Sequence, residues 1–241
     1  MNKVVLITGA SRGIGEATAT IFAKNNYDIV INYQKEKEKA ENLSHELEKK
    51  YKIKTLCIKC DISSEEEVKN MFDLINKTFN KLDVVVNNAG IAIDSILEDK
   101  TKETFRKTLD INLIGPFLVS KYAKKYITKG AVVNVSSTNS INSYYPFSID
   151  YDASKAGLNL LTKDLAVEFA PNIRVNAVAP GWVNTDMNKT LDQEFIDEEL
   201  KKITLKRFAE PLEIAKVIYF LASEDASYIN GEIIVVDGGR N

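Results

Sequence analysis

The chain has 241 residues and a mass of 27.0 kDa, with 44% hydrophobic and 27% charged residues. This composition is ordinary for a globular protein and excludes a disordered, collagen-like or coiled-coil chain. The 32 basic and 34 acidic residues nearly cancel, so the charge gives no footprint for nucleic acid or for an anionic membrane surface.

Histidine and cysteine usage narrows the chemistry further. The only histidine of the sequence is His45, which excludes a multi-histidine metal site. Cys57 and Cys60 match a C-x-x-C pattern, but side chains three residues apart on a strand point to opposite faces, so we predict no shared redox or metal site. Residues 1–7 lack the pattern of a secretion signal, and no stretch of about 18 apolar residues occurs. We expect a cytoplasmic protein without metal, membrane span or nucleic-acid partner.

Short apolar, β-branched segments alternate with longer segments of helical periodicity along the whole chain. Most of the short segments are continuously apolar, which is typical of strands buried on both faces of a parallel sheet. The predicted strands cover residues 3–8, 28–33, 54–58, 83–87, 131–136, 174–179 and 232–236. Between them, apolar residues spaced by three and four predict helices, including one over 65–79 that Ser63-Ser64, followed by Glu66-Glu67, open in the manner of a capping box.

Seven strands joined by crossover helices predict a single α/β domain over residues 1–241. The expected fold class is a doubly wound Rossmann domain, a seven-stranded and mostly parallel sheet with helices on both faces. No linker rich in Pro, Gly or Ser interrupts this alternation. The least regular stretch, about 181–208, is interpreted as a helix-bearing excursion that acts as a substrate lid.

The first predicted strand runs into a glycine-rich turn that opens a helix. In such a turn backbone amides approach a pyrophosphate closely, and the helix N-terminus favours an anion. The alternative is a tight turn without a ligand, which the strand–turn–helix context disfavours. The predicted cofactor contacts in this turn are Gly9, Ser11, Arg12, Gly13, Ile14 and Gly15.

The end of the second predicted strand indicates which dinucleotide binds. A ribose 2′-hydroxyl is usually held there by Asp or Glu, and this chain has Tyr33, Gln34 and Lys35 instead. Arg12 and Lys35 are both suited to pair with a 2′-phosphate. They favour NADP(H) over NAD(H), with two ordinary surface cations as the alternative.

Tyr151 and Lys155 are spaced to lie on one face of a helix. A phenol has a pKa of about 10, and a neighbouring ammonium lowers it toward the range of a useful general acid. The preceding predicted strand ends at Ser136 and Ser137, and ligands of parallel sheets bind outside the carboxyl ends of strands. Ser137 is therefore predicted to donate to a substrate carbonyl beside Tyr151, unless it only caps the loop.

Taken in order, these elements resemble the short-chain dehydrogenase/reductase family over nearly the whole chain. Within it, segments between Arg207 and Gly239 are similar to the bacterial 3-oxoacyl-(acyl-carrier-protein) reductases. The matching segments are residues 8–15, 60–61, 87–90, Asn112, 136–137, 151–155, 180–181 and 236–239.

The resemblance implies a role for each member of a catalytic tetrad. Tyr151 would protonate the carbonyl oxygen, and Ser137 would orient that oxygen. Lys155 would lower the pKa of the tyrosine and hold the nicotinamide ribose. Asn112, in a helix expected over about 101–127, would help to hold a water that relays protons to Lys155.

The resemblance also implies cofactor contacts beyond the glycine-rich turn. Asp61 and Ile62 would meet the adenine, while Val183 and Thr185 would hold the carboxamide. The other implied contacts, besides Tyr151 and Lys155, are Asn88, Ala89, Gly90, Pro180 and Gly181.

Three features depart from the family pattern. Ser137 and Tyr151 are 14 positions apart instead of the usual 13, so the 138–150 loop is one residue longer and Ser136 remains an alternative. The 144–147 aromatic segment would narrow an acyl channel or stack on a ring-shaped substrate. A basic residue used for docking a carrier protein is missing before the sixth strand, with Lys124, Lys125 and Lys129 as nearby candidates.

These patterns lead to ranked hypotheses. The first is NADPH-dependent reduction of a 3-oxoacyl thioester to a 3-hydroxyacyl thioester, of the fatty-acid-synthesis type, with an acyl carrier protein as a candidate partner. The second is a family member acting on a free small ketone, sugar or cyclic alcohol. A catalytically silent dinucleotide-binding regulator is third, and the intact tetrad disfavours it. The resemblance further implies a homotetramer, although the apolar helix positions concerned are equally compatible with packing on the sheet.

Overall fold

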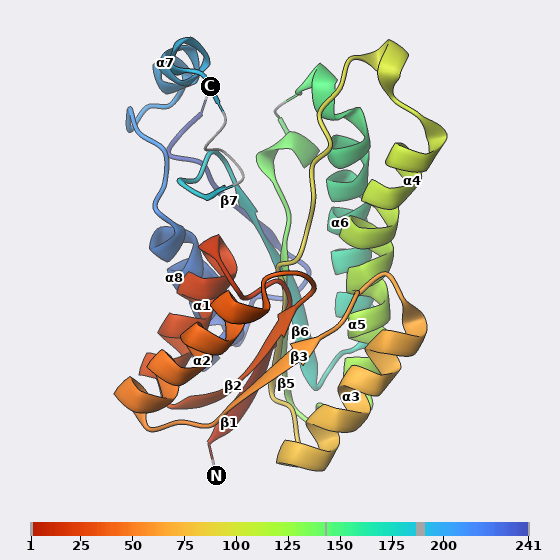
Figure 1. The fold of residues 1–241 in the computed structure, drawn as a ribbon, viewed down its shortest axis with the longest axis vertical. Coiled ribbons are helices and arrows are strands. Elements are labelled where there is room, and N and C mark those ends of the chain that lie inside the picture. The colour runs from red at the N-terminus through yellow and green to blue at the C-terminus, as the bar shows by residue number, and fades with distance from the viewer. Residues whose placement is uncertain (1, 143, 187–190, 241) are drawn as a thin grey trace.

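The computed structural model describes residues 2–142, 144–186 and 191–240. The described residues form one seven-stranded sheet in the order β3-β2-β1-β4-β5-β6-β7, with every neighbouring pair parallel (Figure 1). The predicted sheet is therefore confirmed, each strand within one residue of its expected bounds at either end. The strands are β1 (Lys3–Ile7), β2 (Tyr27–Tyr33), β3 (Thr55–Lys59), β4 (Val84–Asn87), β5 (Gly130–Val135), β6 (Ile173–Pro180) and β7 (Ile233–Val236).

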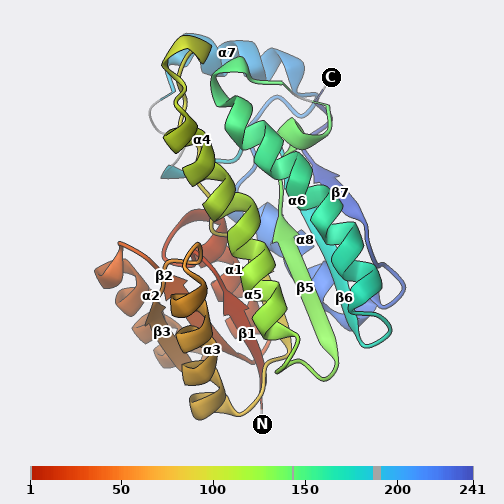
Figure 2. The ribbon, with the colours of Figure 1, turned by 90° about the vertical axis from the view of Figure 1, so that its right-hand side faces the viewer.

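Helices cover both faces of the sheet (Figure 2). α1 (Gly13–Lys24), α2 (Lys37–Tyr51) and α8 (Pro211–Ala222) lie on one face. α3 (Glu65–Phe79), α4 (Lys102–Leu109), α5 (Gly115–Ala123) and α6 (Ile149–Glu168) lie on the other. α7 (Gln193–Lys202) lies beyond the carboxyl ends of the strands, near the C-terminus. The predicted excursion over 181–208 thus contains a helix, while residues 187–190 of it lie outside the described residues.

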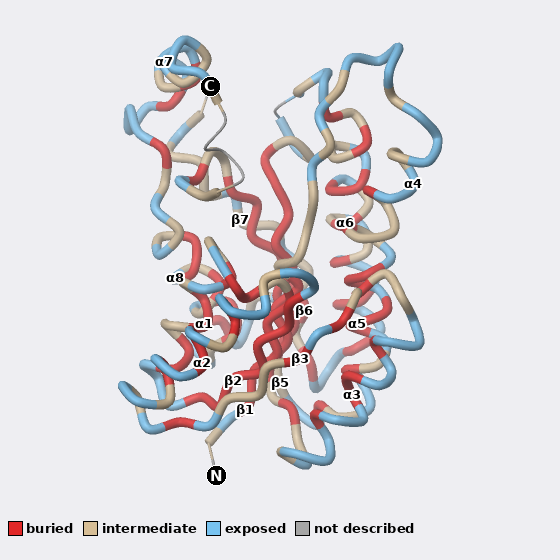
Figure 3. The backbone as a smooth tube through the Cα atoms, viewed as in Figure 1, coloured by how far each residue is buried: buried red, intermediate tan, exposed pale blue. Residues whose placement is uncertain are grey.

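The inner strands of the sheet are the most deeply buried part of the molecule (Figure 3), whereas most residues of the edge strands β3 and β7 are half-buried. Successive side chains of a strand point to opposite faces of the sheet, and because both faces are covered by helices the inner strands are continuously apolar. In β1, Val5 packs into the layer under α1 and α8, and Leu6 packs into the layer under α3 and α5. Each fully buried side chain of this size contributes about 1.5–3 kcal/mol. Cys57 and Cys60 likewise belong to opposite layers, as predicted.

α3 begins and ends where the sequence predicts. Ser64 caps it by accepting a hydrogen bond from the Glu67 amide at 3.4 Å. The predicted capping box is wrong in its second half, because the Glu67 carboxylate accepts from the Asp61 amide at 2.9 Å instead of turning back to Ser64. This hydrogen bond ties the first turn of α3 to the segment that follows β3.

The helix predicted over about 101–127 is not a single α-helix. α4 passes through a π-helical segment, Asp110–Ile114, into α5, which ends at Ala123. Pro116 gives the physical reason, since it has no N–H to donate to the carbonyl of Asn112 four residues earlier. α6 starts two residues before the predicted Tyr151, at Ile149.

No helix among the described residues is long and apolar enough to cross a membrane. Within the same residues, no group of three or more His, Cys, Asp or Glu side chains is arranged to hold a metal ion.

Candidate active site

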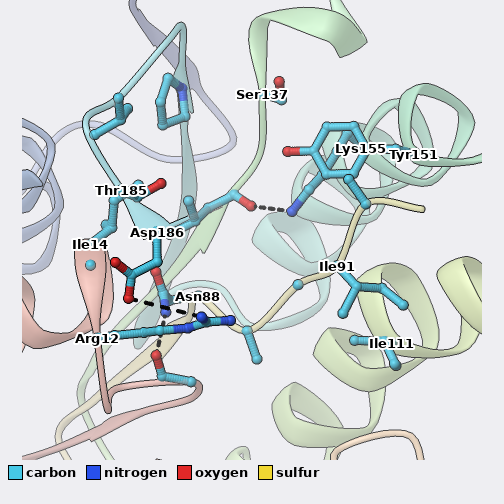
Figure 4. Close-up of a pocket in the computed structure, with 18 of the residues that line it drawn as sticks. Arg12, Ile14, Asn88, Ile91, Ile111, Ser137, Tyr151, Lys155, Thr185 and Asp186 are labelled. Carbon is cyan, nitrogen blue, oxygen red and sulfur yellow. Dashed lines mark hydrogen bonds and ion pairs between the residues drawn. The ribbon is translucent and has the colours of Figure 1, made fainter. Parts of the chain in front are cut away.

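A cleft of about 610 Å³ opens over the carboxyl ends of the strands. It lies across the point where the strand order reverses between β1 and β4, which is where doubly wound sheets bind ligands. Its walls are the turns that follow β1 to β6 (Figure 4). Except for Gly15 and Asn112, every residue predicted to bind cofactor or to catalyse lines this cleft.

The glycine-rich turn after β1 is locked to the segment after β4. Gly9 has φ +63°, and a Cβ there would lie 2.9 Å from the Cα of Ala89. The Asn88 side-chain amide donates to the carbonyls of Thr8 and Gly9, at 2.9 and 3.0 Å. Gly15 lies beneath the turn, where a Cβ would meet the Gly9 carbonyl oxygen at 2.4 Å. Gly15 therefore shapes the turn without lining the cleft.

This turn fits the pyrophosphate of a dinucleotide. α1 starts at Gly13, and its N-cap residue, Arg12, makes no side-chain capping hydrogen bond. The amides of the first turn therefore have no side-chain acceptor from the cap residue, and they lie at the positive end of the helix dipole. Gly13 has φ +58°, and a Cβ there would come 3.3 Å from the Thr185 methyl group across the cleft.

At the adenosine end of the cleft, Gln34 and Lys35 directly follow β2, and Glu36 comes next in the cleft wall. Tyr33 ends that strand, and Lys35 follows it in the wall of the cleft. Arg12 reaches across the mouth, with Nη1 4.0 Å from the Asp186 carboxylate (Figure 4). Lys39 lies at the same distance from Asp186. Both ion pairs are exposed, so they hold the cations only weakly in place.

Lys155 is 4% exposed, and its Nζ donates to the Val135 carbonyl oxygen at 2.7 Å (Figure 4). Burial lowers the pKa of Lys155 to about 8. Its Nζ lies 5.5 Å from the centre of the Tyr151 ring. The predicted Tyr–Lys pair is thus brought together, although the ammonium is directed at a backbone carbonyl.

The lowering of the Tyr151 pKa by Lys155 stays a prediction, since burial acts in the opposite direction in this structure. Loss of water around the phenol, reinforced by the charges of Asp152 and Asp94, raises the pKa of Tyr151 to about 12. A hydrogen bond with Ser137 acts in the opposite direction but is outweighed. Tyr151 is therefore a protonated phenol at neutral pH.

Ser137, and not Ser136, lies beside the phenol. Ser137 follows β5, and its hydroxyl accepts a hydrogen bond from the Asn139 amide at 3.2 Å in addition to its contact with Tyr151. The hydroxyl of Ser136 is directed away, donating to Asn159 Oδ1 at 2.6 Å. The extra residue in the 138–150 loop therefore does not displace the predicted serine.

The side chain of Asn112 does not reach the cleft. It is fully buried, and its amide donates to the Ile91 carbonyl at 2.8 Å and to Ser154 Oγ at 3.1 Å. Its Oδ1 accepts from the Ile91 amide at 2.9 Å. These bonds tie the π-helical segment to α6 and to the segment after β4.

Aromatic side chains form a wall of the cleft that the sequence predicted only in part. Tyr145 and Trp182 line opposite sides, and Phe195 of α7 contacts both, with ring centroids 6.0 and 5.5 Å away. Trp182 lines the cleft and also packs beneath α7. Its indole N–H donates to the Glu199 carboxylate at 2.7 Å.

Asp94, Asp186 and Arg240 also line the cleft, and sequence reasoning missed them. Asp94 and Asp186 belong to irregular connections, and Arg240 is next to the C-terminus. None of them belongs to a motif with a fixed spacing. Their only available signal was that connections after parallel strands meet at one edge of the sheet.

Fold and site together define a Rossmann-fold oxidoreductase of the nicotinamide-dependent class. A family model described as enoyl-(acyl carrier protein) reductase matches residues 9–241. The chain belongs to the short-chain dehydrogenase/reductase family.

Similar proteins span several substrates. The chain is 39% identical to 3-oxoacyl-(acyl-carrier-protein) reductase FabG of Staphylococcus epidermidis, covering 99% of both chains. It is 35% identical to glucose 1-dehydrogenase 2 of Bacillus subtilis, covering 98% of this chain and 94% of that protein. A short-chain dehydrogenase of Burkholderia cenocepacia, solved in complex with NADP, superposes with a TM-score of 0.94 at 30% identity, covering 98% and 97% of the two chains.

Proposed function

We propose that this protein reduces a 3-oxoacyl thioester to a 3-hydroxyacyl thioester with NADPH as the reductant. The observation that carries the proposal is the full-length similarity to a 3-oxoacyl-(acyl-carrier-protein) reductase, together with a cleft that brings Tyr151 and Ser137 side by side at the strand ends. Fold alone would not specify the substrate.

The cofactor preference rests on charge at the adenosine end. Arg12 and Lys35 supply two cations there, and β2 is not followed by the carboxylate that would bind a ribose 2′-hydroxyl. An arginine guanidinium suits a phosphate well because it donates two parallel hydrogen bonds. Asp61 and Ile62 would contact the adenine, and Val183 and Thr185 the carboxamide, all from positions in the cleft wall.

Tyr151 would act as the general acid. The bound nicotinamide supplies the hydride chemistry, and the protein supplies placement and the proton. With its pKa raised to about 12, the phenol keeps its proton at neutral pH and still gives it to an alkoxide, which is a much stronger base. In the reverse reaction the same phenol would have to accept a proton as phenolate. Ser137 would hold the carbonyl oxygen beside that proton.

Lys155 and Asn112 would replenish the proton. The ammonium of Lys155 is held between the Val135 carbonyl and the Tyr151 ring, where it would also contact the nicotinamide ribose. Pro116 cannot donate to the carbonyl of Asn112, and we propose that a water bonds to that carbonyl. A water there would connect Lys155 to solvent and serve as the relay.

A second candidate is the reduction or oxidation of a free small ketone, sugar or cyclic alcohol. The aromatic wall of Tyr145, Trp182 and Phe195 favours it, since these rings narrow the space available to a long acyl chain. The similarity to a glucose 1-dehydrogenase points the same way. Lys124 and Lys125 also lie at the end of α5 that is farther from the cleft, so they are poorly placed to dock a carrier protein at its mouth (Figure 1).

The test is a rate comparison with matched cofactors. Oxidation of NADPH and of NADH is followed by absorbance with acetoacetyl-CoA, with the same acyl group on acyl carrier protein, and with free ketones; oxidation of sugars is assayed with NADP⁺ and NAD⁺. Fast NADPH-dependent turnover of the thioesters supports the first candidate. Turnover confined to free ketones or sugars supports the second. Tight NADPH binding without turnover of any substrate would indicate a silent dinucleotide-binding regulator.

Assembly and lid movement are also proposals. Exposed apolar side chains on α5, α6 and β7, among them Phe117, Leu160 and Val235, are consistent with the homotetramer that the family resemblance implies. Sedimentation equilibrium tests this assembly. Contact of Phe195 with both cleft walls supports a lid that includes α7, and proteolysis with and without NADPH tests its closure.

A further inference from the structure

A buried cation lies next to the candidate active site without taking part in the proposed chemistry. Lys100 precedes α4, and its side chain is 3% exposed. Its Nζ donates to Asp150 Oδ1 at 2.9 Å, to the Phe147 carbonyl at 3.3 Å and to the Ile93 carbonyl. The three acceptors belong to two segments of the chain, the one after β4 that contains Ile93 and the one from Phe147 to Asp150.

Asp150 is the fully buried partner of this cation. Its other oxygen, Oδ2, accepts a hydrogen bond from Thr108 Oγ1 of α4 at 2.7 Å. Burial by itself would raise the pKa of Asp150, but the hydrogen bonds from Thr108 and Lys100 outweigh it and hold the pKa below its usual value. The carboxylate is therefore charged and fixed in place by two donors.

The pair is important because its acidic member belongs to the helix that carries Tyr151. Asp150 is in the first turn of α6 and directly precedes Tyr151. The N-cap residue of α6, Ser148, makes no capping hydrogen bond, because its hydroxyl donates to Asp94 instead. A helix end without a side-chain cap leaves its first amides unsatisfied and frays readily. The turn that carries Tyr151 must be held by something else.

The same contacts join the two segments that flank the substrate end of the cleft. The Ser95 amide donates to the Phe147 carbonyl at 3.0 Å, parallel to the Lys100 contacts. A lysine near the N-terminus of a helix also opposes the helix dipole, so its burial there is unfavourable by local rules. A residue that is placed against such a local preference is typically one whose role is to position its neighbours and not to stabilise the fold.

We propose that the Lys100–Asp150 ion pair positions Tyr151, replacing a helix cap and holding the phenol at its distance from Ser137. The pair acts through Tyr151 and does not touch the substrate. The proposal rests on the proposed function, because it assigns the residues that align its general acid.

The test removes both charges together, so that neither is left buried without a partner. Lys100→Met with Asp150→Asn is compared with wild type and with Arg174→Met, which removes a half-buried cation that caps the far end of α8 through the Leu221 and Ser223 carbonyls. In the double variant kcat is expected to fall about 10- to 100-fold, while the dissociation constant for NADPH is unchanged. Arg174→Met is expected to lose stability but to keep kcat per folded molecule. Wild-type kcat in the folded double variant would overturn the proposal.

A second readout is independent of any substrate. Fluorine NMR of fluorotyrosine-labelled protein, with Tyr151→Phe assigning the resonance, reports the surroundings of the phenol. Thr108→Val, which removes one donor to Asp150 and keeps the side-chain volume, is expected to shift and broaden this resonance; an unchanged resonance in both Thr108→Val and the double variant would refute the positioning role. If wild type reduces no carbonyl, the proposed function fails while this measurement still decides on the ion pair.

Discussion

Replacing Lys155 by methionine is expected to abolish turnover and yet to stabilise the fold at neutral pH. The physical reason is the burial of its ammonium, which lowers the pKa of Lys155 from 10.5 to about 8. A group that binds its proton less tightly in the folded chain than in the unfolded chain lowers the stability of the fold. The full effect is present at every pH at which the group is protonated in both states. Methionine keeps an unbranched apolar side chain of similar length and removes the charge.

The magnitude follows from that difference in pKa. At about 1.36 kcal/mol for each pKa unit, the difference between 10.5 and 8 corresponds to roughly 3 kcal/mol. Loss of the hydrogen bond from Nζ to the Val135 carbonyl takes back about 1 kcal/mol. Lys155→Met should therefore gain about 2 kcal/mol of unfolding free energy at pH 7.

The sign of the pH dependence makes the test specific. Between about pH 8 and 10.5 the unfolded chain binds more protons at this lysine than the folded chain, so the stability of wild type relative to the variant rises with pH. Urea unfolding of both proteins from pH 7 to 10 measures the difference, in which every shared titration cancels. Lys163→Met, an exposed change on the same helix, is the control. A difference that stays constant with pH, or a less stable Lys155→Met at pH 7, would refute the reasoning.

Three further changes test the site and the fold. Tyr151→Phe should lower kcat by about 10²- to 10⁴-fold and leave NADPH binding intact, as measured by turnover and by fluorescence titration; normal turnover would remove Tyr151 as general acid. Joint replacement of Arg12 and Lys35 by alanine should raise the dissociation constant of NADPH by about 10- to 100-fold and leave that of NADH unchanged, and an equal effect on both would contradict 2′-phosphate recognition. Ser64→Ala should lower the unfolding free energy by about 1 kcal/mol through loss of the α3 cap, while Thr78→Ala on the same helix, whose hydroxyl only bonds the Leu74 carbonyl, should cost much less in the same urea titration.

The fold could be predicted from the sequence because local and global signals agree. Seven continuously apolar segments, separated by helical periodicity, permit little other than a parallel sheet covered on both faces. The glycine-rich turn was predictable for the same reason, since Gly9 adopts a left-handed conformation against Ala89 that other residues rarely adopt. The Tyr151–Lys155 spacing gained meaning only from the strand that precedes it.

What could not be predicted depends on three-dimensional surroundings. Spacing places Lys155 near Tyr151, but only the structure shows that its ammonium bonds to the Val135 carbonyl and that burial raises the pKa of the phenol. The Lys100–Asp150 pair joins residues 50 positions apart, with no motif to link them. Long-range pairing of single polar residues leaves no periodic trace in a sequence.

The pKa values of Lys155 and Tyr151 shift in opposite directions, and in both groups the charged form is the one disfavoured. Burial makes the Lys155 ammonium easier to deprotonate and the Tyr151 phenol harder to deprotonate, so both groups are held toward neutrality. A neutral phenol is the form that a reductase needs, whereas an alcohol dehydrogenase needs phenolate. Any bound group that brings negative charge beside Lys155 would favour the ammonium and so keep a proton ready for the relay. The Lys155→Met measurement tests this electrostatic argument for the ammonium without a substrate.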